Sequence, residues 1–151
     1  MKTLIVTGAS RGVGFEICKQ LAVKGHKVIA LSRNIKPLRN IENVYPYSVD
    51  LSIKSQVNGF VKEVAANFNT IDVLINNAGS LVNKPFLDLS SAEFEEVYKV
   101  NVFAVATLTR LILPSMDTKG HVLNITSMGG IQGSTKFPGL SAYSSSKGAL
   151  I

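Results

Sequence analysis

Tyr143 and Lys147 stand four residues apart near the end of the sequence, a spacing that places two side chains on one face of a helix. An ammonium group beside a phenol favours the phenolate and lowers the pKa of a tyrosine from its usual value of about 10. Such a tyrosine is suited to protonate a carbonyl oxygen while the carbonyl carbon receives a hydride. The same pair is also common as a plain surface contact, so the chemistry is predicted only if the chain holds a nicotinamide cofactor.

A glycine-rich turn near the N-terminus could hold that cofactor. Gly8, Gly12 and Gly14 give the spacing Gly-x-x-x-Gly-x-Gly directly after an apolar segment that is predicted to be a strand. A glycine turn lets the backbone approach a pyrophosphate, and the N-terminus of the helix that follows supplies N–H groups and a positive dipole. The alternative is a tight strand-to-helix turn without a ligand, and the position after the first strand favours the cofactor site.

Charges near the second predicted strand bear on the choice of cofactor. A site for NAD usually places Asp or Glu at the end of this strand, on the ribose hydroxyls, whereas residues 31–34 contain no carboxylate. Arg33 and Arg11 could instead pair with a 2′-phosphate, which favours NADP(H) over NAD(H). The alternative for Arg33 is an exposed loop arginine. Asp50 either accepts a hydrogen bond from the adenine amine or caps a helix that begins near Ser52.

The elements that must position these residues alternate between strand and helix patterns, which predicts βαβ units and a parallel sheet. Short apolar segments predict strands at residues 3–7, 27–32, 44–49, 71–76 and 121–126. Helical periodicity predicts helices at about 12–24, from 52, at about 91–113 and from about 141. Pro46 suggests an edge position for the third strand. Ser90 and Glu93 form a capping box before the long helix.

Composition limits the class of protein. The chain has 151 residues, of which 46% are hydrophobic, enough for one domain spanning 1–151. No run of 18 apolar residues is present, so no membrane span is expected. Cys18 is the only cysteine, which leaves no internal disulfide or cysteine-based metal site and favours the cytoplasm. The net charge of +6 comes from dispersed Lys and Arg, so we expect no nucleic-acid partner.

Taken together, the motifs resemble the short-chain dehydrogenase/reductase family, in its Tyr-x-x-x-Lys branch. The matches run in order along the whole chain: the turn 7–14, the Asp50-Leu51 pair, the Asn-Asn-Ala-Gly motif at 76–79, and a catalytic tetrad. The resemblance implies that the catalytic residues are Asn101, Ser127, Tyr143 and Lys147. It implies cofactor contacts from Gly8, Ser10, Arg11, Gly12, Val13, Gly14, Arg33, Asp50, Leu51, Asn77, Ala78, Gly79, Tyr143 and Lys147.

The resemblance also implies a role for each member of the tetrad. Tyr143 would be the general acid/base, and Lys147 would lower its pKa and bind the nicotinamide ribose. Ser127 would donate to the substrate oxygen, although turn formation beside two glycines is an alternative. Asn101 would hold a water that relays protons to the lysine, whereas the residues alone also allow a satisfied core amide. Residues 77–79 would form the floor under the cofactor, or only a turn that ends a strand.

The implied fold is a doubly wound Rossmann domain of at least five parallel strands in the order 3-2-1-4-5. The implied function is hydride transfer between NADP(H) and a small-molecule carbonyl or alcohol, in a dimer or tetramer. Sixteen positions separate Ser127 from Tyr143, a few more than is usual, with Ser134 as a fallback for Ser127. The later strands and substrate lid of the family are missing after Ile151, so we expect a C-terminally incomplete domain. The alternative function is therefore NADP(H) binding without turnover.

Overall fold

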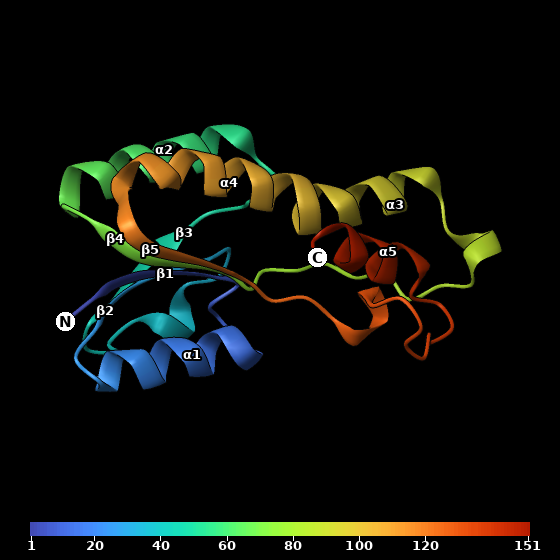
Figure 1. The fold of residues 1–151 in the computed structure, drawn as a ribbon, viewed down its shortest axis with the longest axis horizontal. Helices are drawn as coiled ribbons and strands as arrows, with labels where there is room; N and C mark the ends of the chain where they lie inside the picture. Colours follow the sequence, from blue (N-terminus) through green and yellow to red (C-terminus); the bar gives the residue numbers. More distant parts are fainter.

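A computed structural model describes residues 1–151, and its centre is one parallel sheet (Figure 1). The strand order is β3-β2-β1-β4-β5, which is the predicted order. Each pair of neighbouring strands is parallel. The strands are β1 (Thr3–Thr7), β2 (Lys27–Ser32), β3 (Val44–Ser48), β4 (Ile71–Asn76) and β5 (Met116–Asn124).

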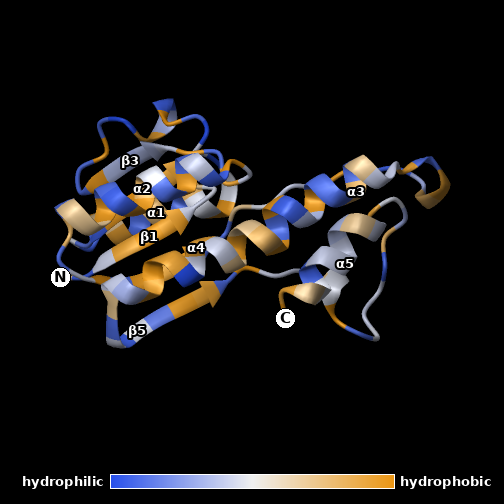
Figure 2. Ribbon diagram, turned by 90° about the horizontal axis from the view of Figure 1, so that it is seen from above, coloured by the Kyte–Doolittle hydropathy of each residue, from blue (hydrophilic) through white to orange (hydrophobic).

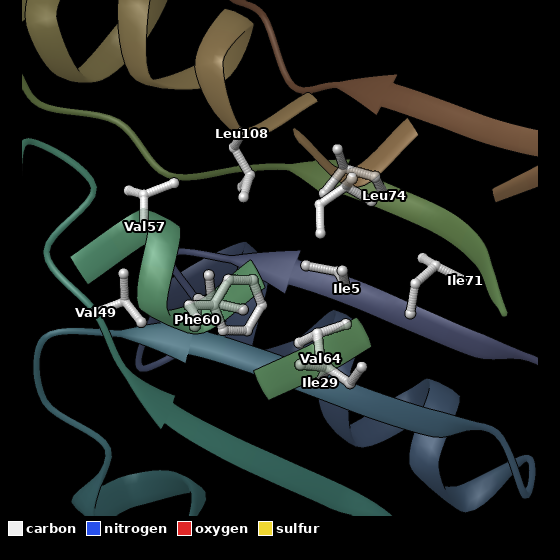
Figure 3. Packing of buried hydrophobic residues seen from close by; sticks show 11 residues of the cluster. Ile5, Ile29, Val49, Val57, Phe60, Val64, Ile71, Leu74 and Leu108 are labelled. Atoms are coloured by element: carbon white, nitrogen blue, oxygen red, sulfur yellow. The ribbon is translucent and has the colours of Figure 1, made fainter. Parts of the chain in front are cut away.

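Alternating side chains on the strands build a core on each face of the sheet. Ile5 and Leu74 belong to the core cluster that also holds the helix residues Phe60 and Leu108 (Figure 3). The next residue of β1, Val6, belongs to a second cluster with Cys18 and Ala22 of the first helix. Because successive strand side chains point to opposite faces, apolar strands without alternating polar residues fit a sheet that is covered on both sides.

Five α-helices provide that cover and extend beyond it. α2 and α4 lie on one face of the sheet and α1 on the other, while α3 and α5 lie side by side past the ends of the strands (Figure 1). The helices are α1 (Gly12–Val23), α2 (Lys54–Asn67), α3 (Ser91–Tyr98), α4 (Ala104–Ile112) and α5 (Ser141–Ala149). Short 3-10 turns, η1 (Lys36–Leu38), η2 (Phe86–Asp88), η4 (Leu113–Ser115) and η5 (Met128–Gly130), complete the chain.

The long predicted helix is interrupted in its middle. Ser90 accepts from the Glu93 N–H and the Glu93 carboxylate accepts from the Ser90 N–H, as the capping box predicts. After α3 the backbone widens into a π-turn, η3 (Lys99–Phe103), before α4 begins. π-turns inside helices are frequent at functional sites. The whole stretch Ser91–Ser115 is long and apolar enough to cross a membrane by length and composition, yet its apolar residues Leu108 and Ile112 are buried in the core.

Several element boundaries differ from the predictions, most clearly those of α2 and β5. α2 begins at Lys54 rather than near Ser52, because Asp50 first closes a turn on the Ser52 N–H and hydroxyl. β5 begins at Met116 rather than at residue 121, and its register with β4 shifts between these positions. It ends at Asn124 rather than at residue 126; just after it, the Ile125 N–H donates to the Asn76 carbonyl and the Ile125 carbonyl accepts from the Lys147 ammonium. β5 lies at the edge of the sheet (Figure 2).

Candidate active site

A cleft of about 670 Å³ opens at the carboxyl ends of the strands, and it gathers residues from both ends of the sequence. The glycine turn after β1, the end of β2, the segments after β3 and β4, and one face of α5 all line it. Every residue predicted to contact the cofactor lines this cleft except Gly14. Ligands bind at this edge of open parallel sheets, so the predicted residues meet at the position expected for a binding site.

The glycines of the turn have different physical tasks. Gly8 and Gly12 have φ values of +67° and +57°, a backbone conformation that residues other than glycine rarely adopt. Gly14 lies outside the cleft lining because it packs α1 against the turn. A Cβ at Gly14 would come within 2.5 Å of the Gly8 carbonyl oxygen and 2.4 Å of Asn77 Nδ2. Arg11 is the N-cap of α1, and its side chain makes no capping hydrogen bond. The first N–H groups of α1 therefore have no side-chain partner and are available to a ligand.

Thr7 and Asn77 hold the glycine turn against the turn that follows β4. The Thr7 hydroxyl accepts hydrogen bonds from the N–H groups of Asn77 and Ala78, each at 3.0 Å. The Asn77 amide donates to the carbonyls of Thr7 and Gly8 at 2.9 and 3.2 Å. These bonds make one rigid floor from two loops. Thr7 was not predicted as a site residue, and its polar side chain in an apolar strand was the available signal.

The basic end of the cleft lies between β1 and β2. Arg11 and Arg33 line it together with Ser10 and Ser32, and the Ser32 hydroxyl donates to the Ser10 hydroxyl at 2.7 Å. Two guanidinium groups and two hydroxyls form a donor set suited to a phosphate group. Sequence analysis missed Ser32, which occupies the strand end where a carboxylate would stand in an NAD site.

Asp50 lies on the wall of the same cleft. Its Oδ1 accepts from the Ser52 N–H at 2.9 Å and from the Ser52 hydroxyl at 2.7 Å. These hydrogen bonds, followed by the nearby charges of Arg33 and Lys99, lower the pKa of Asp50 below its usual value. Asp50 therefore closes a turn before α2, and it does so as a carboxylate that also borders the cleft.

Tyr143 and Lys147 line the opposite end of the cleft from one face of α5. The Lys147 ammonium lies 5.9 Å from the centre of the Tyr143 ring and donates to the Ile125 carbonyl at 2.7 Å. Lys147 is only 3% exposed, and this burial lowers its pKa. A phenol and a buried ammonium thus face the volume that the glycine turn borders, an arrangement suited to proton transfer.

Asn101 sits in the π-turn with none of its surface exposed. Its Oδ1 accepts from the Ser80 N–H at 2.7 Å, and its Nδ2 donates to the Ser80 carbonyl and the Ser146 hydroxyl at 2.9 and 2.8 Å. Both ends of the amide thus have hydrogen-bond partners within the protein, as the core-amide interpretation predicts. A Cβ at Gly79 would lie 3.6 Å from Asn101 Oδ1 and 3.7 Å from Lys147 Nζ, so both atoms border one small space.

Ser127 follows Thr126, which lines the cleft, while Ser127 itself is not part of the lining. It is the N-cap of η5, and its Oγ accepts from the Gly129 N–H at 3.3 Å, as the turn interpretation predicts. The hydroxyl of Ser134 is engaged elsewhere, because it donates to the carbonyls of Met128 and Ile131. The structure therefore offers no support for Ser134 as a replacement for Ser127.

Comparisons with known proteins agree with this geometry. The family model described as short chain dehydrogenase matches residues 2–151. The ketoacyl reductase HetN of Nostoc sp. is 37% identical over 99% of the chain and 55% of its own length. The NADPH-dependent 1-acyldihydroxyacetone phosphate reductase of Saccharomyces cerevisiae is 34% identical over 99% of the chain and 52% of its own length. The chain thus spans about half the length of these curated relatives.

Solved structures of other proteins have a similar fold. A metagenomic short-chain oxidoreductase in complex with NADP has a TM-score of 0.89 at 31% identity, over 99% of this chain and 71% of the other. A 4-hydroxyisoleucine dehydrogenase complexed with NADH has a TM-score of 0.88 at 29% identity, over 99% of this chain and 65% of the other. Similar folds therefore occur with either nicotinamide cofactor.

Proposed function

Because the chain belongs to the short chain dehydrogenase family, we propose that it transfers hydride between NADP(H) and a small carbonyl or alcohol. One observation carries the proposal. Tyr143 and Lys147 line the same cleft as the glycine turn and the two arginines, although more than 100 residues separate them in the sequence. A plain surface pair would have no reason to line one cleft with the glycine turn and both arginines.

The residues of the cleft fit the parts of a dinucleotide phosphate. The glycine turn and the N-terminus of α1 suit the pyrophosphate, since close backbone approach and free N–H groups are available there. Arg11 and Arg33, with the hydroxyls of Ser10 and Ser32, suit a 2′-phosphate. The preference for NADP(H) rests on this donor set, because relatives of this fold use both cofactors.

Chemistry at the other end of the cleft follows from the positions of the side chains. The bound nicotinamide would supply or accept the hydride. Tyr143 donates a proton to the carbonyl oxygen, or removes it from the alcohol in the reverse direction. Lys147, fixed by the Ile125 carbonyl, stabilises the phenolate that remains. Ser127 is assigned to the substrate oxygen, and Asn101 to the water that connects Lys147 with solvent, on the strength of the family motif.

Turnover tests the proposal directly. NADPH oxidation is followed with a panel of small ketones and aldehydes, for the unaltered chain and for Tyr143→Phe. The variant should lose turnover by a factor of roughly 100 or more while it still binds NADPH. Tyr45→Phe is the matched control, because Tyr45 is partly exposed on β3 and lies against Phe68, away from the cleft.

An unchanged rate in Tyr143→Phe would remove Tyr143 from the reaction. NADPH binding without turnover by the unaltered chain would favour the alternative, a binding protein. The chain spans about half the length of its curated relatives, so the test uses these 151 residues as they stand.

A further inference from the structure

Ser146 lies between Tyr143 and Lys147 in the sequence of α5. None of its surface is exposed, and it does not line the cleft. Its hydroxyl donates to the Tyr143 carbonyl at 2.7 Å and accepts from Asn101 Nδ2 at 2.8 Å. Ser146 therefore joins the helix that carries Tyr143 and Lys147 to the π-turn that carries Asn101.

The single proton of the hydroxyl gives this contact a direction. Because Ser146 donates to the Tyr143 carbonyl, it can only accept from Asn101, so the NH₂ end of the amide must face α5. The amide oxygen is thereby turned toward the Ser80 N–H and toward the space beside Gly79. The Ser80 backbone selects the same orientation, since its N–H meets Oδ1 and its carbonyl meets Nδ2.

We propose that Ser146 is a positioning residue that orients the Asn101 amide and sets the distance between Asn101 and the Tyr143–Lys147 pair. The proposal rests on the proposed function. A buried hydroxyl that served only to bond its own helix would need no second partner, because serine hydroxyls bond the carbonyl three or four residues earlier without help. Ser146 has that second partner, and the partner is a residue of the predicted tetrad.

Its neighbour Ser145 provides a matched control. The Ser145 hydroxyl donates to the Ala142 carbonyl at 3.1 Å, so it makes the same kind of bond within the same helix. Ser145 is exposed, and its hydroxyl bonds only within α5. Ser145→Ala removes the local bond alone, whereas Ser146→Ala removes the local bond and the bond to Asn101.

The experiment compares Ser146→Ala, Ser145→Ala, Asn101→Ala and the double variant Ser146→Ala/Asn101→Ala. We expect Ser146→Ala to lower kcat roughly tenfold while the Kd for NADPH changes less than about twofold, because a small displacement near reacting groups costs rate rather than binding. Ser145→Ala should leave kcat unchanged. In the Asn101→Ala background, Ser146→Ala should have little further effect, since both substitutions remove one unit.

Either of two results would overturn the proposal. One is that Ser146→Ala and Ser145→Ala have the same kcat. The other is that Ser146→Ala lowers kcat by the same factor in the unaltered chain and in Asn101→Ala. A second cycle measures the unaltered chain, Ser146→Ala, Asn101→Ala and the double variant by urea unfolding, and it needs no activity. If the unaltered chain shows no turnover, the proposed function fails, and non-additive unfolding still supports the Ser146–Asn101 contact. Additive unfolding would show that the two side chains are not coupled and would end the proposal on its own.

Discussion

Gly79 borders the space between Asn101 Oδ1 and Lys147 Nζ, and the absence of a side chain keeps that space open. A Cβ there would lie 3.6 and 3.7 Å from these atoms, which is ordinary van der Waals contact. Gly79→Ala should therefore fold normally but fill the space that the proposed function assigns to a relay water. We predict that kcat falls by about tenfold or more, with a melting temperature close to that of the unaltered chain.

Gly59→Ala serves as the control for this substitution. Gly59 is an exposed residue within α2, and a Cβ there would meet no atom within 4 Å. Alanine should stabilise the helix by about 0.5–1 kcal/mol and leave kcat unchanged. An unaltered kcat in Gly79→Ala would show that this space takes no part in the reaction.

Burial of Lys147 links its charge to stability. Its pKa in the folded chain is below the ordinary value of 10.5. At a pH between these two values, Lys147 is more often protonated in the unfolded chain than in the folded chain. Stability from this residue therefore rises with pH through that window. In urea unfolding, the free-energy difference between the unaltered chain and Lys147→Met should shift in favour of the unaltered chain from pH 7 to pH 10. A difference that is constant with pH would contradict the cost assigned to the buried ammonium.

Most residues that line the cleft could be predicted from the sequence, but not those that hold its walls together. Tyr143, Lys147 and the glycine turn could be predicted because their types and spacing carry the chemistry. Thr7 and Ser146 act through hydrogen bonds to segments distant in the sequence. A single serine or threonine carries no local pattern that reveals such a partner, so only the fold could show these roles.

At the scale of elements, the capping box fixes the start of α3. The Ser90 hydroxyl accepts from the Glu93 N–H, while the Glu93 carboxylate also pairs with Lys84. Ser90→Ala should cost about 1 kcal/mol of stability, measured by thermal or urea unfolding. Ser91→Ala, at the exposed next position, should change stability far less. Equal losses from the two substitutions would show that the box does not stabilise the helix.

The lysine partner makes this cap resistant to acid. The hydrogen bond from Lys84, together with those from Ser90, lowers the pKa of Glu93 to about 2. A lowered carboxyl pKa contributes stability that is present at neutral pH and is lost as the pH falls through the folded-state pKa. The difference in unfolding free energy between the unaltered chain and Glu93→Gln should therefore persist at pH 5 and shrink progressively as the pH falls from 4.5 to about 2.

Element types were easier to predict than element ends. Strands β1, β2 and β4 have the predicted bounds because apolar runs define them directly. The start of α2 and both ends of β5 differ from the predictions: Asp50 closes a turn on Ser52 before α2, and the register of β5 with β4 shifts. The π-turn within the long helix was also not predicted, because the apolar periodicity continues through it.

At the scale of the whole molecule, two cores hold the sheet and its carboxyl edge carries the cleft. The alternation of strands and helices predicted a parallel sheet, and the family resemblance implied the strand order that the structure has. The cleft depends on this order, because it places the segments after β1, β2 and β4 at one edge. We propose that this cleft binds NADP(H).

The most direct test is a paired titration with NADPH and NADH, read as binding and as thermal shift, on the unaltered chain and on Arg33→Ala. A ligand that binds only the folded state stabilises it by about 2.7 kcal/mol at one hundred times its Kd. We predict that NADPH binds at least about tenfold more tightly than NADH, a difference of about 1.4 kcal/mol, and that Arg33→Ala removes most of this preference. Equal affinities would contradict the assignment of the arginines to a 2′-phosphate, and no response to either nucleotide would contradict the cofactor site itself.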